Sequence, residues 1–188
     1  MTHLAAGTVL SEKQSGMWTF IMAECLIFSA YFIIYMLYRG HDPDTFRSAQ
    51  AHLSPAFGFA NTVVLVTSSW QAALGLHDAR SANYAAASRR VAITVGLGAV
   101  FVASKLTEWG FELRNGNTFG SNDFFSFYFF LTGIHLVHVF IGFVFMGAAI
   151  YDLRSARPSH ESVETASIYW HMVDFLWVVI FALLYVVG

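Results

Sequence analysis

Charged residues are scarce in this 188-residue sequence. Asp, Glu, Lys and Arg make up 12% of it, about half of the share that is typical of soluble domains. The scarcity excludes a protein that faces water on all sides, and the 56% hydrophobic content indicates a membrane protein. The 10 basic and 12 acidic residues give a net charge of −2, which excludes nucleic-acid binding through bulk electrostatics.

Cysteine and proline are also rare. Cys25 is the single cysteine, so the chain can form no internal disulfide and no cysteine-based zinc or iron–sulfur site. The three prolines and 14 glycines are too few for a collagen-like or disordered chain.

Long apolar runs fill most of the sequence. A helix needs about 20 apolar residues to cross the hydrocarbon layer of a membrane, and five runs have that length. They lie near residues 17–38, 56–76, 91–112, 124–150 and 168–187. The prediction is an all-α, polytopic membrane protein, a bundle of five transmembrane helices in which residues 1–188 form a single domain.

The basic residues between the runs predict an orientation, because Lys and Arg concentrate in cytoplasmic loops. One side of the membrane would carry Lys13, Arg80, Arg89, Arg90, Arg154 and Arg157. The other side would carry Arg39, Arg47 and Arg114. The amino terminus is therefore predicted to be cytoplasmic.

Seven ionisable side chains lie inside the apolar runs, where a charge is costly and needs a partner. They are Glu24, Lys105, Glu108, His135, His138, His171 and Asp174. Lys105 and Glu108 are three residues apart on one predicted helix, which predicts an intramembrane ion pair.

The other five are predicted to form a buried polar cluster. Glu24, His171 and Asp174 lie at similar depths from the same membrane side, and Glu24 is expected to contact His138 or His171. The cluster could be an interhelical hydrogen-bond network that fixes helix packing or a proton-handling site. A third reading is haem or metal ligation by the histidines. It is disfavoured because the helices leave no slot for a macrocycle, so no metal ligand is predicted. No catalytic residue is predicted either.

Four segments carry a more specific signal. They are Gly16–Glu24, Asn61-Thr62 with Ser68-Ser69, Phe127–Val139 with Gly142, and Glu164 with Tyr169–Trp177. In this order, and with Glu108 between the second and third, they resemble subunit III of the haem–copper respiratory oxidases over nearly the whole chain. The resemblance is to a five-helix bacterial form, because the first two helices of the seven-helix form have no counterpart.

The resemblance implies a non-catalytic subunit of a terminal oxidase in aerobic respiration, located in the bacterial inner membrane. Such a subunit packs on the catalytic subunit I beside the other respiratory subunits and supports proton uptake and stability. It implies that haem and copper lie in the partner subunit, that this chain has no cofactor of its own, and that membrane lipid, including a bound phospholipid, is a further partner. Glu24 matches the position of the family's buried carboxylate.

Two alternatives remain open at this point. Lys105-x-x-Glu108-Trp109 and Ser68-Ser69-Trp70 resemble the branch that accompanies nitric oxide reductases, so the chain could be an accessory subunit of such a complex. The intramembrane charges also suit an independent proton-coupled carrier, although five uninterrupted spans are unlike the repeats and broken helices of transporters.

Overall fold

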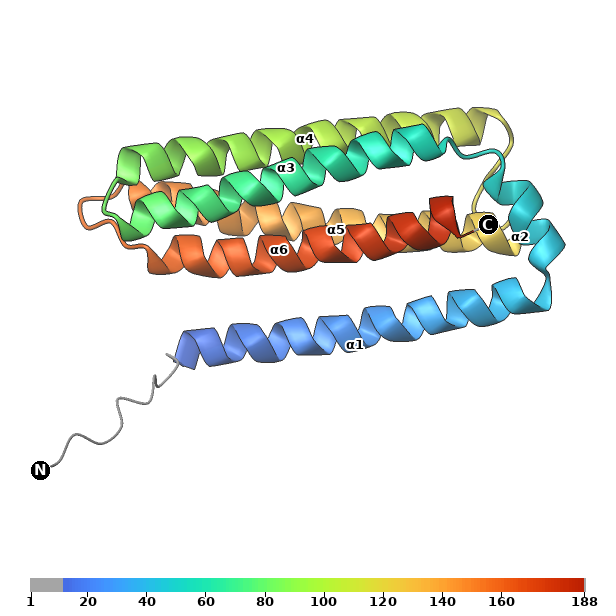
Figure 1. The fold of residues 1–188 in the computed structure, drawn as a ribbon, viewed down its shortest axis with the longest axis horizontal. Helices are drawn as coiled ribbons and strands as arrows, with labels where there is room; N and C mark the ends of the chain where they lie inside the picture. Colours follow the sequence, from blue (N-terminus) through green and yellow to red (C-terminus); the bar gives the residue numbers. More distant parts are fainter. Residues whose placement is uncertain (1–11, 188) are drawn as a thin grey trace, which may run out of the picture.

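A computed structural model describes residues 12–187, which fold into six α-helices and a final π-helical turn. The elements are α1 (Glu12–His41), α2 (Pro43–Gln50), α3 (Pro55–Arg80), α4 (Tyr84–Arg114), α5 (Asp123–Leu153), α6 (Glu161–Phe181) and η1 (Ala182–Val186). The five long helices run side by side, and α2 lies across one end (Figure 1). The all-α prediction is therefore confirmed for this part of the chain.

The helix boundaries follow local sequence signals. The side chains of Asp42, Asn83 and Asn122 each accept a hydrogen bond from the backbone N–H three residues later, as N-caps do. Pro43 and Pro55 occupy the first turns of α2 and α3, where the missing N–H costs nothing. Short turns between these boundaries force neighbouring helices to run antiparallel.

Four of the long helices are long and apolar enough to cross a membrane: the spans are Gly16–His41, Tyr84–Arg114, Asp123–Leu153 and Glu161–Val186. Helix α3 has 26 residues, about 39 Å at 1.5 Å per residue, but polar side chains such as Asn61, Ser69 and Gln71 keep it outside this group. The membrane character is supported, whereas the predicted count of five spans is not confirmed.

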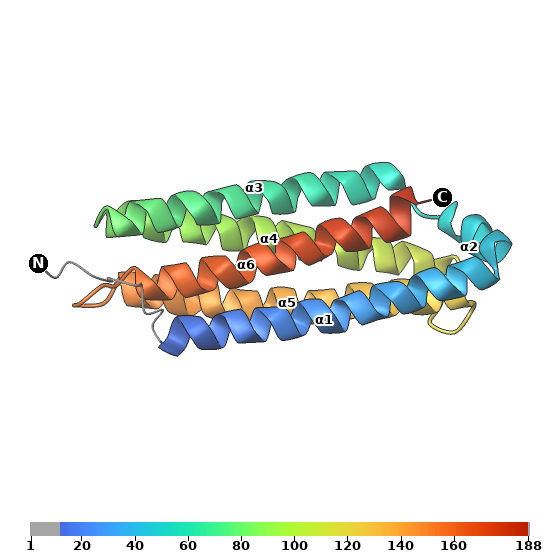
Figure 2. The ribbon, with the colours of Figure 1, turned by 60° about the horizontal axis from the view of Figure 1, so that its bottom comes forward.

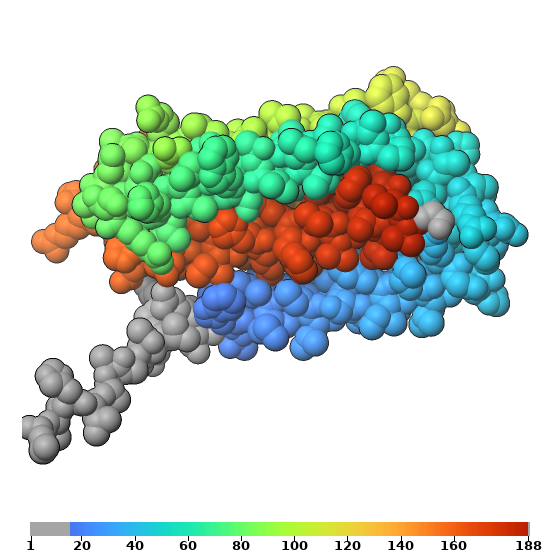
Figure 3. Space-filling model, viewed as in Figure 1, coloured from blue at the N-terminus to red at the C-terminus, as the bar shows by residue number. Residues whose placement is uncertain are grey.

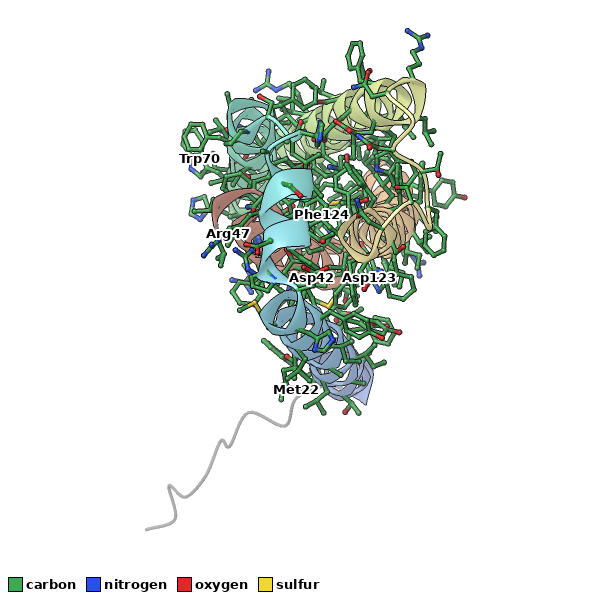
Figure 4. The ribbon with its side chains drawn as sticks, turned by 90° about the vertical axis from the view of Figure 1, so that its right-hand side faces the viewer. Met22, Asp42, Arg47, Trp70, Asp123 and Phe124 are labelled. Carbon is green, nitrogen blue, oxygen red and sulfur yellow. The ribbon has the colours of Figure 1, made fainter. Side chains whose placement is uncertain are left out.

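Helix α2 lies in a stretch that the sequence pattern assigned to a polar break between spans. Although α2 is polar in composition, its residue Phe46 is buried. The Phe46 ring packs against Tyr35 of α1 and Phe124 of α5 at centroid distances of 5.5 and 5.8 Å. Figure 4 looks at this end, with α2 in front of the bundle and Asp42 and Phe124 labelled. Helix α2 thus connects α1 to the rest of the molecule.

Helices α3 to α6 form a closely packed bundle, and the indole of Trp170 lies at its centre. A Cβ atom added at Gly98 of α4 or at Gly142 of α5 would lie 2.7–2.8 Å from its nearest neighbours, which include the Trp170 ring at 2.8 and 2.7 Å. The Trp170 Nε1 donates to Ser68 Oγ of α3 at 2.8 Å. One side chain of α6 therefore joins all four helices, and glycine is needed on both sides of it.

Helix α1 lies along the edge of this bundle, beside α5 and α6 (Figures 1 and 2). Aromatic rings along one face of α1 pack against α5 and α6. The Tyr35 hydroxyl also donates to the Leu183 carbonyl at 3.1 Å, and Arg39 donates to the Val187 carbonyl. The space-filling view shows α1 as a separate ridge along one side of the molecule (Figure 3).

Candidate functional site

The first group of buried polar side chains surrounds Lys105 in α4. The Lys105 Nζ lies 2.7 Å from Glu108 Oε2, 2.6 Å from the Tyr185 hydroxyl and 3.3 Å from the Tyr128 hydroxyl. The Tyr185 hydroxyl in turn donates to Glu108 Oε1 at 2.6 Å. The ammonium also lies 4.6 Å from the centroid of the Tyr128 ring and 5.2 Å from that of Trp177. Every polar atom of the ion pair therefore has a partner.

This Lys105 group can hold a neutralised charge pair inside the membrane at limited cost. Lys105 is fully buried and Glu108 nearly so, and a buried pair is tolerated when its remaining hydrogen-bonding groups are satisfied. The i, i+3 spacing indicated the ion pair, but no local pattern indicated Tyr128 and Tyr185, because they come from α5 and η1 and meet Lys105 only in the folded bundle.

A second buried carboxylate, Glu112, lies one turn beyond Glu108 and was not among the predicted site residues. Its Oε2 accepts a hydrogen bond from Asn117 Nδ2 at 2.7 Å. Glu108 and Glu112 line a cavity of about 290 Å³ with His52 and Asn115 at the end of the bundle where α2 lies. Glu112 falls at the boundary of a predicted span, where a carboxylate is ordinarily solvated, so its burial could not be predicted from the sequence pattern.

The second group joins α1 to α5 through Glu24 and His138. The His138 Nε2 lies 3.2 Å from Glu24 Oε2, and its Nδ1 lies 2.9 Å from the Ile134 carbonyl oxygen. A carbonyl only accepts, so Nδ1 must donate, and Nε2 of a neutral ring then carries no hydrogen. Because an ionised carboxylate also only accepts, the contact requires one additional proton, on His138 or on Glu24. The pair is therefore a hydrogen bond between α1 and α5 that contains this one proton.

The third group lies between α3 and α6. The Ser69 hydroxyl is 2.5 Å from His171 Nδ1, and His171 is exposed on the surface of the chain. Asp174 is buried, and neither of its oxygens has a hydrogen-bond partner within the distance and angle limits of a hydrogen bond among the described residues; Ser69 is the neighbouring side chain that interacts with it.

The five residues predicted as one polar cluster are thus divided between separate places. Tyr169 of α6 faces α5, where its hydroxyl donates to the His138 carbonyl at 3.3 Å. His171, two residues later, points about 200° away around the helix and reaches α3 instead. Equal depth in the membrane did not bring Glu24 and His171 together, because depth does not specify the face of a helix.

His135 is fully buried, and its two ring nitrogens have no hydrogen-bond partner in residues 12–187. The ring packs edge-on against Phe101 at 5.6 Å and lies 5.3 Å from the Trp177 ring. His138 points to α1 and His171 to α3, so these two histidines do not face each other across a gap. In the part of the chain that the structure describes, no group of three or more His, Cys, Asp or Glu residues is arranged to hold a metal ion.

Outside the membrane-spanning helices, the carboxyl of Asp42 has a lowered pKa. Hydrogen bonds from the Thr45 side chain and backbone N–H hold the pKa of this exposed carboxyl below its ordinary value of 3.8. Its role is local, as the cap of α2.

Comparison with known proteins shows the family to which this chain belongs. The model of the family described as cytochrome c oxidase subunit III matches residues 3–188. Cytochrome c oxidase subunit 3 of a Synechocystis species is 32% identical over 177 residues, which cover 92% of this chain and 75% of that protein. Quinol oxidase subunit 3 of Bacillus spizizenii is 29% identical, with 92% and 86% covered. Cytochrome bo(3) ubiquinol oxidase subunit 3 of Buchnera aphidicola is 23% identical, with 96% and 97% covered. The chain therefore belongs to the cytochrome c oxidase subunit III family.

Proposed function

We propose that this chain is a non-catalytic subunit of a haem–copper terminal oxidase complex, which packs on catalytic subunit I and supports its stability and proton uptake. The match of the family model to residues 3–188 carries the proposal. The relatives include subunits of both cytochrome c oxidases and quinol oxidases, so the proposal specifies the type of complex and not its electron donor.

The Glu24–His138 pair supports the part of the proposal that concerns protons. It joins α1 to α5 through a 3.2 Å contact, and the Glu24 side chain keeps 18% of its surface exposed. This carboxylate lies at the edge of the bundle, where a neighbouring subunit can reach it, whereas Glu108 of the Lys105 group lines a cavity at the end of the bundle. In this proposal the haem and copper that reduce oxygen belong to the partner subunit.

The proposal also includes the topology: one domain over residues 1–188, five spans with α3 among them, and a cytoplasmic amino terminus in a bacterial inner membrane. In a chain carrying Cys25→Ser, a cysteine at position 80 should resist an impermeant thiol reagent added to intact cells, and a cysteine at position 114 should react. Efficient labelling at position 80 would reverse the orientation.

Purification through a tag on this chain tests the assignment to a complex. From mild detergent, the full-length chain should bring down haem-containing subunits that consume oxygen with a reductant. After stronger detergent separates the subunits, the isolated chain should show no Soret band. A Soret band on the isolated chain, or its recovery without any haem-containing partner under mild conditions, would contradict the proposal.

A further inference from the structure

The last residues that the structure describes form the π-helical turn η1 instead of a further α-helical turn of α6. The Val187 N–H donates to the Ala182 carbonyl, five residues earlier, at 2.9 Å. In an α-helix the same N–H would donate to the carbonyl four residues earlier, which is that of Leu183. Turns of this kind are rare, and many lie at functional sites. The π-helical form therefore leaves the Leu183 carbonyl for another donor.

Helix α1 supplies that donor. The Tyr35 hydroxyl donates to the Leu183 carbonyl at 3.1 Å. Four residues later, on the same face of α1, the Arg39 guanidinium donates to the Val187 carbonyl. Both side chains are buried. Carbonyls at the carboxyl end of a helix lack donors within the helix, and a cation is favourable there. These two contacts from α1 consequently stabilise η1 in its π-helical form.

The same turn carries Tyr185 to the Lys105 group. The Tyr185 hydroxyl lies 2.6 Å from Lys105 Nζ, from which it accepts, and it donates to Glu108 Oε1 at 2.6 Å. One residue of η1 thus bridges both members of the buried ion pair. A π-helical turn contains more residues than an α-helical turn, so a change from one form to the other would rotate Tyr185 relative to α4.

A cavity of about 420 Å³ beside η1 gives the turn space to change its winding. Tyr185 and Val186 line it on one side. The other lining residues belong to α2, to the turn after it and to the beginning of α3: Arg47, Gln50, Ala51, Leu53 and Pro55. The cavity lies at the end of the bundle that α2 crosses (Figure 1). A rotated Tyr185 ring can therefore be accommodated beside η1.

We propose that η1 is a conformational switch that couples the position of α1 to the Lys105 group. With α1 in place, its two donors hold η1 in the π-helical form, and Tyr185 bridges the buried ion pair. When α1 moves away, the Val187 N–H takes the Leu183 carbonyl, η1 rewinds as an α-helix, and Tyr185 leaves the ion pair. Helix α1 is the least covered of the four candidate spans, which makes it the helix that can move. The switch goes beyond the proposed function, since it concerns contacts within this chain.

The reactivity of Lys105 toward an amine-acylating reagent measures the switch in the full-length chain in detergent, because Tyr185 is one of the groups that enclose the ammonium. The chain has two lysines, so Lys13 serves as the internal reference in mass spectrometry. Tyr35→Phe removes the hydroxyl that binds η1 and keeps the ring. The loss of one hydrogen bond should raise the rate of Lys105 acylation about fivefold.

Two controls separate the switch from a general loosening of α1. Tyr38→Phe makes the same change on a ring of α1 that packs against Phe127 of α5 at 5.2 Å, and it should leave the rate within about twofold of wild type. In a Tyr185→Phe background, Tyr35→Phe should add no further increase, because the hydroxyl that η1 brings to the ion pair is already absent. An unchanged rate with Tyr35→Phe, an equal increase with Tyr38→Phe, or the full increase in the Tyr185→Phe background would overturn the coupling.

An experimental structure of the full-length double variant Tyr35→Phe/Arg39→Gln tests the rewinding itself. The variant removes both donors of α1 and leaves the packing of the bundle unchanged. Its Val187 N–H should donate to the Leu183 carbonyl. Retention of the π-helical hydrogen bond in the folded variant would overturn the switch.

Discussion

Helices α1 and α6 are both apolar enough to cross a membrane, yet they are covered very differently. In their most apolar 18-residue windows, 17% of α1 is buried inside the chain, against 56% of α6. Helix α6 packs against neighbours on several sides, with Trp170 between two glycines. Helix α1 exposes large side chains such as Leu26, Ile33 and Leu37 along its length. Hydropathy therefore finds a span but does not say whether protein or another surface covers it.

The two regions also differ in the interactions that hold them in place. The α3–α6 bundle depends on close packing around buried polar groups, whereas α1 depends on one row of aromatic contacts with α5 and α6, on a few hydrogen bonds and on α2. Changes inside the bundle should consequently cost much more stability than changes along α1.

Removal of Lys105 should have the largest effect. Lys105→Ala leaves the buried Glu108 carboxylate without its cation and should lower the free energy of unfolding by about 3–5 kcal/mol. Unfolding in mixed detergent and denaturant micelles measures the loss. The control is Lys105→Met/Glu108→Gln, which removes both charges and should recover most of the stability; a loss below about 1 kcal/mol for Lys105→Ala would show that the pair is not buried as described.

Gly142→Ala should have the next largest effect, because its Cβ would lie 2.7 Å from the Trp170 ring. Overpacking of this kind costs about 1–3 kcal/mol. Gly133→Ala, on the same helix, is the matched control: its Cβ would lie 3.6 Å from Trp109, an ordinary contact, and alanine favours the helix. Equal unfolding free energies for the two variants would contradict the tight packing around Trp170.

Glu24→Ala probes the attachment of α1 to the bundle. It removes one hydrogen bond between α1 and α5, and such bonds in membrane proteins contribute about 0.6 kcal/mol on average. The expected loss in the same unfolding assay is therefore small. A loss above about 2 kcal/mol would show that α1 is as integral to the bundle as α6.

Acid should produce the smallest and most local effect, at the junction of α1 and α2. The folded pKa of Asp42 lies below its ordinary value, so its stabilisation of α2 is present above about pH 4 and is lost as the pH falls through the folded pKa. Amide exchange at Thr45 should accelerate relative to the bundle in acid. Asp42→Asn keeps a capping side chain without a titrating carboxyl and should abolish that pH dependence; the same dependence in the variant would assign it to another group.

The sequence predicted the elements of this structure better than their contacts. Each of the first four predicted spans lies within one helix, because continuous apolar runs specify helices in a membrane directly. Helix α2 was missed, since its one buried ring, Phe46, stands among polar residues. For the site, spacing within one helix indicated Lys105 with Glu108. It could not indicate Tyr185, nor decide between His138 and His171 for Glu24, because those contacts depend on helix rotation and on residues far apart in the chain.

In the proposed function, this chain supports catalysis in a partner subunit without performing it. Glu24→Gln tests it most directly in the assembled complex, because the change removes a titrating group and preserves the shape of the side chain. Oxygen consumption should begin close to the wild-type rate, with a deficit in proton uptake or in the activity retained over many turnovers. Complete and immediate loss of activity in a correctly assembled complex with its full haem and copper content would contradict the account.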